Sequence, residues 1–144
     1  MKKSDEMSLN AHHYGVTVSD MEEAVDFYAE TLGLEVVDRF RESDEAFNEA
    51  VGTAGVEAEL LFMDAGGCLV ELLEYVPTGD DVTGASSNDV GASHFCLEVD
   101  DVFEWYESLD DSVEFVSEPK TISNGATIVY MHDPDGNVVE LVEE

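Results

Sequence analysis

An internal repeat constrains the fold of this 144-residue chain more than any other feature. The segment HYGVTVSDMEEAVDFY, which starts at His13, aligns with HFCLEVDDVFEWYESL, which starts at His94. One offset of 81 positions relates three pairs of landmarks: His13 and His94, Val18 and Val99, and Asp20 and Asp101. Both segments read as alternating residues followed by an amphipathic helix, so we expect two copies of one supersecondary unit.

The sequence after the two segments also follows the same order of elements in both copies. Each copy continues with one strand-like run and then with two more runs around a turn, which is Gly-Gly in the first copy and DPDGN in the second. We therefore predict an α+β fold of two βαβββ modules that form a curved mixed sheet. The expected organisation is an N-terminal tail over residues 1–10 and a single domain over 11–144, with modules at about 11–76 and 92–144 and a linker over 77–91.

Helix signals are clear in both modules. Ser19 and Glu22 fit a capping box for the first helix. Its expected buried stripe consists of Met21, Ala24, Val25, Tyr28 and Leu32. Asp100 or Asp101 is expected to cap the second helix, and residues 43–51 read as a short extra helix in the first module.

The charge is extreme, with 35 acidic residues against 5 lysines and arginines and a net charge of −30. The acids alternate with periodic apolar positions, so they are expected to cover a folded surface. At molar salt the Debye length falls to about 3 Å, which screens their repulsion and favours a protein from a salt-rich cytoplasm. Binding to nucleic acid is not expected without a basic patch, and neither a membrane-length apolar run nor a secretory signal is found.

Strand alternation separates the four histidines. Tyr14, Val16 and Val18 share one apolar face, so His13 is expected on the opposite face, and His94 takes the matching place in the second module. Both are predicted to point into a concave surface. His12 is expected on the other face near the start of the strand, and His132 at the edge of the sheet. The two cysteines, Cys68 and Cys96, lie in apolar runs and are expected to be buried free thiols.

Two glutamates complete the candidate site. Glu71 and Glu140 each occupy a Val-Glu-Leu triplet in the last predicted strand of a module. An ionised glutamate in an apolar strand is costly unless it is paired or coordinated. With His13 and His94 they could converge on one divalent metal ion, and imidazole and carboxylate ligands suit zinc, nickel, cobalt, manganese or iron.

These segments resemble the vicinal oxygen chelate superfamily, also called the glyoxalase, bleomycin-resistance and dioxygenase superfamily. The resemblance rests on HHYGVTVSDMEEAVDFYAETLGLEVV, GCLVELLEY, GASHFCLEVDDV and VYMHDPDGNVVELVE. It implies a glyoxalase-like fold around a metal-binding cleft, with His13, Glu71, His94 and Glu140 at the usual metal positions. Related chains often pair, so a homodimer is expected, with a site that two chains can share.

The resemblance also implies a small-molecule substrate and proton transfer next to a metal-chelated carbonyl. The activity is expected to be that of a metal-dependent lyase or isomerase, most like lactoylglutathione lyase. Glu140 is the first candidate for the proton-transfer residue and Glu71 the second. The alternatives are an enzyme like methylmalonyl-CoA epimerase, a ring-cleaving iron dioxygenase, and a non-catalytic binding or resistance protein.

Outside the N-terminal lysine pair, the basic residues are Arg39, Arg41 and Lys120. Arg39 and Arg41 alternate on one face of a predicted strand, and such cations can hold a substrate carboxylate or phosphate. Pairing with the many surface acids is the competing interpretation. Phe62, Met63 and Tyr130 are candidates for lining the cavity, with core packing as the alternative.

Overall fold

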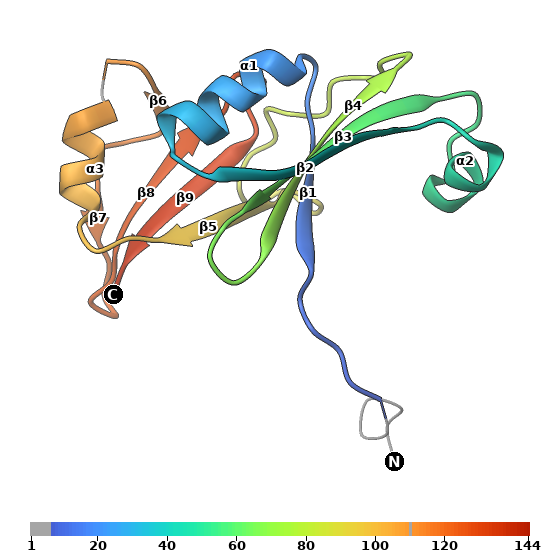
Figure 1. Ribbon diagram of the computed structural model, residues 1–144. Coiled ribbons are helices and arrows are strands. Elements are labelled where there is room, and N and C mark those ends of the chain that lie inside the picture. The colour runs from blue at the N-terminus through green and yellow to red at the C-terminus, as the bar shows by residue number, and fades with distance from the viewer. Residues whose placement is uncertain (1–6, 110) are drawn as a thin grey trace.

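The computed structural model describes residues 7–109 and 111–144. Two modules follow one another along the chain (Figure 1). The elements of the first are β1 (His13–Thr17), α1 (Met21–Val25) with its continuation η2 (Asp26–Thr31), β2 (Glu35–Glu42), α2 (Glu45–Val51), β3 (Glu57–Asp64) and β4 (Leu69–Val76). Those of the second are β5 (His94–Glu98), α3 (Val102–Leu109), β6 (Glu114–Phe115), β7 (Lys120–Thr121), β8 (Thr127–His132) and β9 (Val138–Glu143). The predicted α+β fold of two βαβββ repeats is confirmed.

The strands form two mixed sheets, one in each module. The first has the strand order β1-β4-β3-β2, and the second has the order β5-β9-β8-β6, with the short β7 also paired to β8. The first strand of each module runs parallel to the last, and the remaining pairs are antiparallel. Each module therefore places its first and last strands side by side, although they are far apart in the sequence.

The first helix differs from the predicted capping box. Asp20, not Ser19, is the N-cap, and its side chain accepts hydrogen bonds from the backbone N–H groups of Glu22 and Glu23. The Ser19 side chain is directed to Asp135 instead, to which both its backbone N–H and its hydroxyl donate. The helix then continues as the π-helical η2, in which the adjacent residues Phe27 and Tyr28 are both buried.

The other helix predictions are confirmed. Asp101 caps α3 by accepting from the backbone N–H of Glu104 at 3.1 Å. The extra helix α2 begins after Asp44, whose carboxylate accepts from the backbone N–H of Phe47 at 2.8 Å. Among the described helices, none has both the length and the apolar character that spanning a membrane requires.

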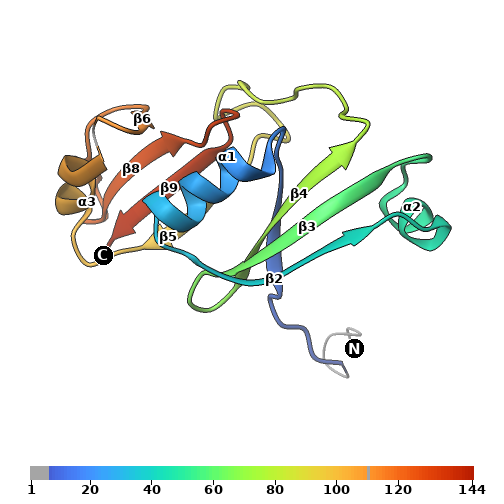
Figure 2. The ribbon, with the colours of Figure 1, turned by 45° about the horizontal axis from the view of Figure 1, so that its top comes forward.

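One hydrophobic core joins the modules. It contains Val16, Leu61 and Leu72 from the first sheet together with Val129 and Leu141 from the second. The π-helical η2 contacts both modules, and Figure 2 shows the helix beside the two sheets near their junction. Because strand residues alternate, the histidines and glutamates of the candidate site lie on the opposite face of each sheet, away from this core.

Candidate metal centre

The first histidine–glutamate pair lies on neighbouring parallel strands. His13 on β1 is aligned with Leu69 on β4, two residues before Glu71, so both side chains project from the same face. The Nε2 atom of His13 lies 3.2 Å from Oε1 of Glu71. The histidine side chain is 35% exposed and the glutamate side chain only 11%, so the carboxylate is largely covered while the ring is accessible.

The second pair repeats this geometry. His94 on β5 is aligned with Val138 on β9, again two residues before the glutamate, Glu140. The Nε2 atom of His94 lies 3.0 Å from Oε1 of Glu140. The repeated register brings together the histidine and glutamate that the sequence predicts for each module. We call His13 with Glu71 the first half-site, and His94 with Glu140 the second half-site.

An aromatic residue lies directly across from each glutamate. Phe62 on β3 is aligned with Glu71, and Tyr130 on β8 is aligned with Glu140. The Phe62 ring meets the His13 ring edge to face, with centroids 5.3 Å apart. The Tyr130 hydroxyl lies 3.2 Å from Nε2 of His94. Both aromatics therefore border a half-site, whereas Met63, the third candidate, is fully buried in the core.

The half-sites remain separate within one chain. Over residues 7–109 and 111–144, no group of three or more histidine, cysteine, aspartate or glutamate side chains is arranged to hold a metal ion. The chain thus brings its four predicted ligands together as two pairs, each on the outer face of its sheet.

Each half-site nevertheless has the chemistry that a divalent cation requires. Imidazole nitrogen and carboxylate oxygen are the donors that zinc, nickel, cobalt, manganese and iron accept. Glu71 is only 8% exposed within an apolar strand, where an ionised carboxylate needs a partner. Gly15 leaves the space this carboxylate occupies, because a Cβ at residue 15 would lie 3.3 Å from Glu71 Oε1. The residues present therefore fit the metal that the donor set implies.

Cys96 occupies the place of Gly15 in the second module, opposite Glu140. It is a free thiol and is exposed, so the expectation of a buried cysteine is wrong for this residue; Cys68, also free, is half-buried. Cys96 is exposed because it lies on the outer face of β5, with His94. Partial burial of the thiol, together with the Glu140 carboxylate, raises the pKa of Cys96 to about 11, so the thiol stays protonated at neutral pH.

The predicted substrate-binding cations lie away from the half-sites. Arg39 is aligned with Leu61, a core residue, and so projects from the helix side of the first sheet. Its guanidinium contacts Glu22 at 2.7 Å and Glu59 at 3.0 Å. Arg41 lies on the same side as Arg39 and is exposed. Lys120 lies on the edge strand β7, 3.0 Å from Glu118.

The two remaining histidines differ from expectation. His12 precedes β1, so strand alternation does not fix its side, and its ring turns toward the first half-site instead of away from it. The Nδ1 atom of His12 lies 2.7 Å from Nδ1 of His13. His132 does not lie at a sheet edge, because β8 is paired with β9 on one side and with β6 on the other.

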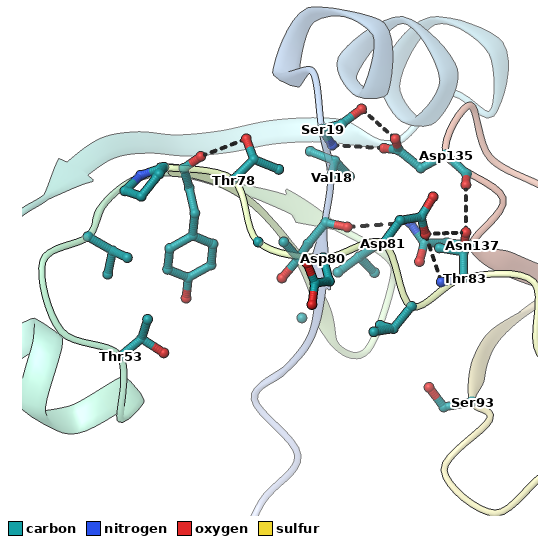
Figure 3. A pocket seen from close by; sticks show the side chains of 18 of the residues that line it. Val18, Ser19, Thr53, Thr78, Asp80, Asp81, Thr83, Ser93, Asp135 and Asn137 are labelled. Atoms are coloured by element: carbon teal, nitrogen blue, oxygen red, sulfur yellow. Dashed lines mark hydrogen bonds between the residues drawn. The ribbon is translucent and has the colours of Figure 1, made fainter.

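A cavity of about 490 Å³, which no sequence feature predicted, lies between β1, the linker and the turn before β9; Gly15 lines it, but His13 and Glu71 do not. Figure 3 shows the linker residues Asp80, Asp81 and Thr83 among the residues that line it, together with Ser19 and Asp135. The Thr83 hydroxyl lies 2.6 Å from a carboxylate oxygen of Asp81 and 3.1 Å from the backbone carbonyl oxygen of Asp135, so the linker contacts the turn before β9. The polar composition of the linker was the available signal, but it indicated only a loop.

Known proteins resemble this chain in sequence and in fold. A probable lactoylglutathione lyase of Vibrio cholerae is 24% identical over 91% of this chain and 88% of its own length. An ethylmalonyl-CoA/methylmalonyl-CoA epimerase of Cereibacter sphaeroides is 27% identical over 90% of this chain and 94% of its own. The crystal structure of a glyoxalase family protein of Bacillus cereus superposes with a TM-score of 0.84 at 24% identity, covering 96% of this chain and 95% of that one.

The relatives carry the names of two different reactions at similar identity, so they define a family and not one reaction. The family model of the Glyoxalase/Bleomycin resistance protein/Dioxygenase superfamily matches residues 10–141, which include both half-sites. The repeated modules, the paired half-sites and this match lead to one conclusion: the chain belongs to the glyoxalase/bleomycin resistance protein/dioxygenase superfamily.

Proposed function

We propose that the protein is a divalent-metal-dependent lyase or isomerase that moves a proton at a carbon next to a carbonyl group, most like lactoylglutathione lyase. The observation that carries this proposal is the histidine–glutamate pair that recurs in one register in both modules. The names of the relatives support it, because a hemithioacetal isomerisation and an α-carbon epimerisation share this proton transfer.

His13, Glu71, His94 and Glu140 are the residues that would hold the metal. When bound, a zinc, nickel, cobalt, manganese or ferrous ion would polarise the substrate carbonyl and stabilise the charge that develops on its oxygen. The imidazoles would act as neutral nitrogen donors and the carboxylates as charged oxygen donors. Two carboxylates would neutralise the dication, which suits a site on a strongly acidic chain.

We further propose that the site is completed by a second copy of the chain. Each half-site supplies only two ligands and lies on the outer face of its sheet, so it needs another sheet to cover it. Apolar surface adjoins the first half-site, where the half-exposed Phe40 stacks on Phe62 with ring centroids 6.0 Å apart. A homodimer would place the first half-site of one chain against the second half-site of its partner.

Glu140 is the proposed proton-transfer residue. Its carboxylate lies within hydrogen-bond distance of His94 Nε2, and the Tyr130 hydroxyl approaches the same nitrogen. Burial and the charge of Glu140 raise the pKa of Tyr130, so its hydroxyl stays protonated and can donate a hydrogen bond. Glu71 is the second candidate, but its carboxylate has less room to move, because Glu71 is buried and its carboxylate lies close to Gly15.

The cavity at the linker, which Gly15 also lines, suits a small neutral or cationic substrate. It is lined by Asp80, Asp81 and Asp135 together with several hydroxyl groups. Arg39, Arg41 and Lys120 do not line it. A thiol adduct with several carboxylates would be repelled by this surface at low ionic strength, and molar salt would screen the repulsion.

The test is an assay at molar potassium chloride with methylglyoxal and a panel of thiols, in which the formation of the thioester product is measured. We expect metal-dependent turnover, with the glutathione adduct gaining more from added salt than the neutral 2-mercaptoethanol adduct. Glu140→Gln should lower kcat by about 100-fold or more, the usual contribution of a general base. Glu98→Gln is the matched control, because this exposed glutamate lies on β5 and on the same outer face of the second sheet as Glu140. Turnover that survives Glu140→Gln would remove Glu140 from the mechanism.

An epimerase is the second candidate, because epimerases occur among the relatives at 26% and 27% identity. Incorporation of solvent deuterium at the α-carbon of methylmalonyl-CoA would favour it over the lyase. Oxygen uptake with catechols would instead indicate a ring-cleaving dioxygenase. A protein without affinity for any divalent metal would favour a binding or sequestering role.

A further inference from the structure

We propose that His12 is a positioning residue for the metal ligand His13, an inference that rests on the proposed metal site. The two Nδ1 atoms lie 2.7 Å apart, and the rings meet nearly at right angles, with centroids 5.0 Å apart. His12 thereby holds the ring nitrogen of His13 that faces away from Glu71. Its role is to fix which nitrogen of His13 carries the proton.

The short distance constrains the protons of both rings. Two ring nitrogens can share a hydrogen bond only when one carries a proton and the other a lone pair. If Nδ1 of neutral His13 donates to His12, then Nε2 of His13 has a free lone pair directed toward the Glu71 side. Metal-bound histidines almost always donate their other ring N–H to a fixed acceptor. We infer that metal binding selects the state in which His13 donates and His12 accepts.

Backbone and ring contacts hold His12 in place despite its exposure. The backbone N–H of Leu69 donates to the His12 carbonyl at 3.0 Å, which extends the β1–β4 pairing by one residue. The His12 ring also approaches Phe62 edge to face, with centroids 6.4 Å apart, beside the closer contact between His13 and Phe62. The acceptor is therefore part of the ordered first half-site.

The second half-site is built differently. The residue before His94 is Ser93, whose hydroxyl accepts a 3.0 Å hydrogen bond from Tyr14. The contact to His94 comes from Tyr130, which approaches Nε2 and not Nδ1. Substitution of His12 should therefore weaken metal binding through one half-site only, and the protein should remain folded.

The experiment measures zinc affinity by calorimetry with a competing chelator at molar salt, for the full chain and three variants. His12→Ala should bind zinc about 10- to 100-fold more weakly, the usual effect of losing a partner of a ligand. His12→Asn should bind zinc with an affinity within about threefold of the wild type, because its amide oxygen is bonded to Cγ, as Nδ1 is in histidine, and can accept the same hydrogen bond. His132→Ala, which removes a histidine outside both half-sites, should leave the affinity unchanged.

Long-range proton–nitrogen correlation spectra of ¹⁵N-histidine-labelled protein give a readout independent of turnover. In the zinc-loaded protein we expect the proton of His13 on Nδ1. Unchanged affinity in His12→Ala, or a His13 that binds zinc through Nδ1, would overturn the inference. An equally weak His12→Asn would also overturn it, by making His12 itself a ligand. Wild-type protein that binds no zinc would instead defeat the proposed metal site, and with it this inference.

Discussion

The hydroxyl of Tyr28 donates a 2.8 Å hydrogen bond to Oδ2 of Asp133, and both side chains are buried. The bond joins η2 of the first module to the turn that precedes β9 of the second. The other oxygen of Asp133 accepts from the backbone N–H groups of Asp135 and Asn137. This carboxylate therefore organises the DPDGN turn and connects the first helix with the strand that carries Glu140.

Replacing Tyr28 with phenylalanine should destabilise the fold without emptying space in the core. The change leaves a buried carboxylate oxygen with one donor fewer, which costs about 1–3 kcal/mol. Chemical denaturation at molar salt measures the free energy of unfolding. Tyr106→Phe is the control, because Tyr106 is only partly buried and packs on Phe115. Equal stability of the two variants would contradict a stabilising role for the bond.

The same tyrosine predicts a loss of stability at high pH. Burial, and then the charge of Asp133, raise the pKa of Tyr28 far above its ordinary value of about 10. The unfolded chain therefore loses this proton first, and its contribution to stability is complete below pH 10 and declines above it. The slope approaches about 1.4 kcal/mol per pH unit for one group. Denaturation curves between pH 9 and 11 should show that the free energy of unfolding falls less steeply with pH in Tyr28→Phe than in the wild type. Identical slopes would contradict a raised pKa of Tyr28.

Gly15→Ala tests whether the Glu71 carboxylate needs the space that Gly15 leaves beside it. The added Cβ would lie 3.3 Å from Glu71 Oε1, so the carboxylate must move by a few tenths of an ångström. We expect zinc affinity to fall about tenfold, in the range seen when the surroundings of a ligand are disturbed. Gly67→Ala is the matched control, since a Cβ there meets nothing within 4 Å. Equal zinc affinity in both variants would show that the carboxylate does not depend on this space.

A mixing experiment tests whether two chains share the site. One variant carries His13→Ala with Glu71→Gln, and the other carries His94→Ala with Glu140→Gln. Each should be inactive alone, because every site contains one defective half-site. A refolded equal mixture should regain about a quarter of the wild-type activity, since each mixed dimer assembles one intact site. Mixed dimers that form without recovering activity would place the complete site within one chain.

The fold and the composition of each half-site were predictable because a repeated pattern determines them. Hydrophobic alternation identifies the faces of β1 and β5. The register of the last strand of each module, β4 or β9, then brings each histidine to its glutamate. These features depend on local sequence and on pairing within one module. They required no knowledge of how the two modules sit relative to each other.

Features that depend on contacts between distant segments were not predictable. Ser19 fits the capping pattern, but Asp135 from the second module binds it and leaves the cap to Asp20. Alternation correctly places Arg39 and Arg41 on one face, but it does not say which face; that follows from pairing with β3, where the register shifts between Val36 and Asp38. His12 lies outside the strand, so alternation could not orient its ring.

Anomalous diffraction at the zinc edge from crystals of the zinc-loaded protein tests directly whether both half-sites bind one metal ion. We expect one zinc ion in contact with Nε2 of His13 and His94 and with the carboxylates of Glu71 and Glu140, at about 2.0–2.2 Å. One chain should supply the first half-site and its partner the second. Zinc held by a single half-site, or by other residues, would contradict a metal site shared between two chains.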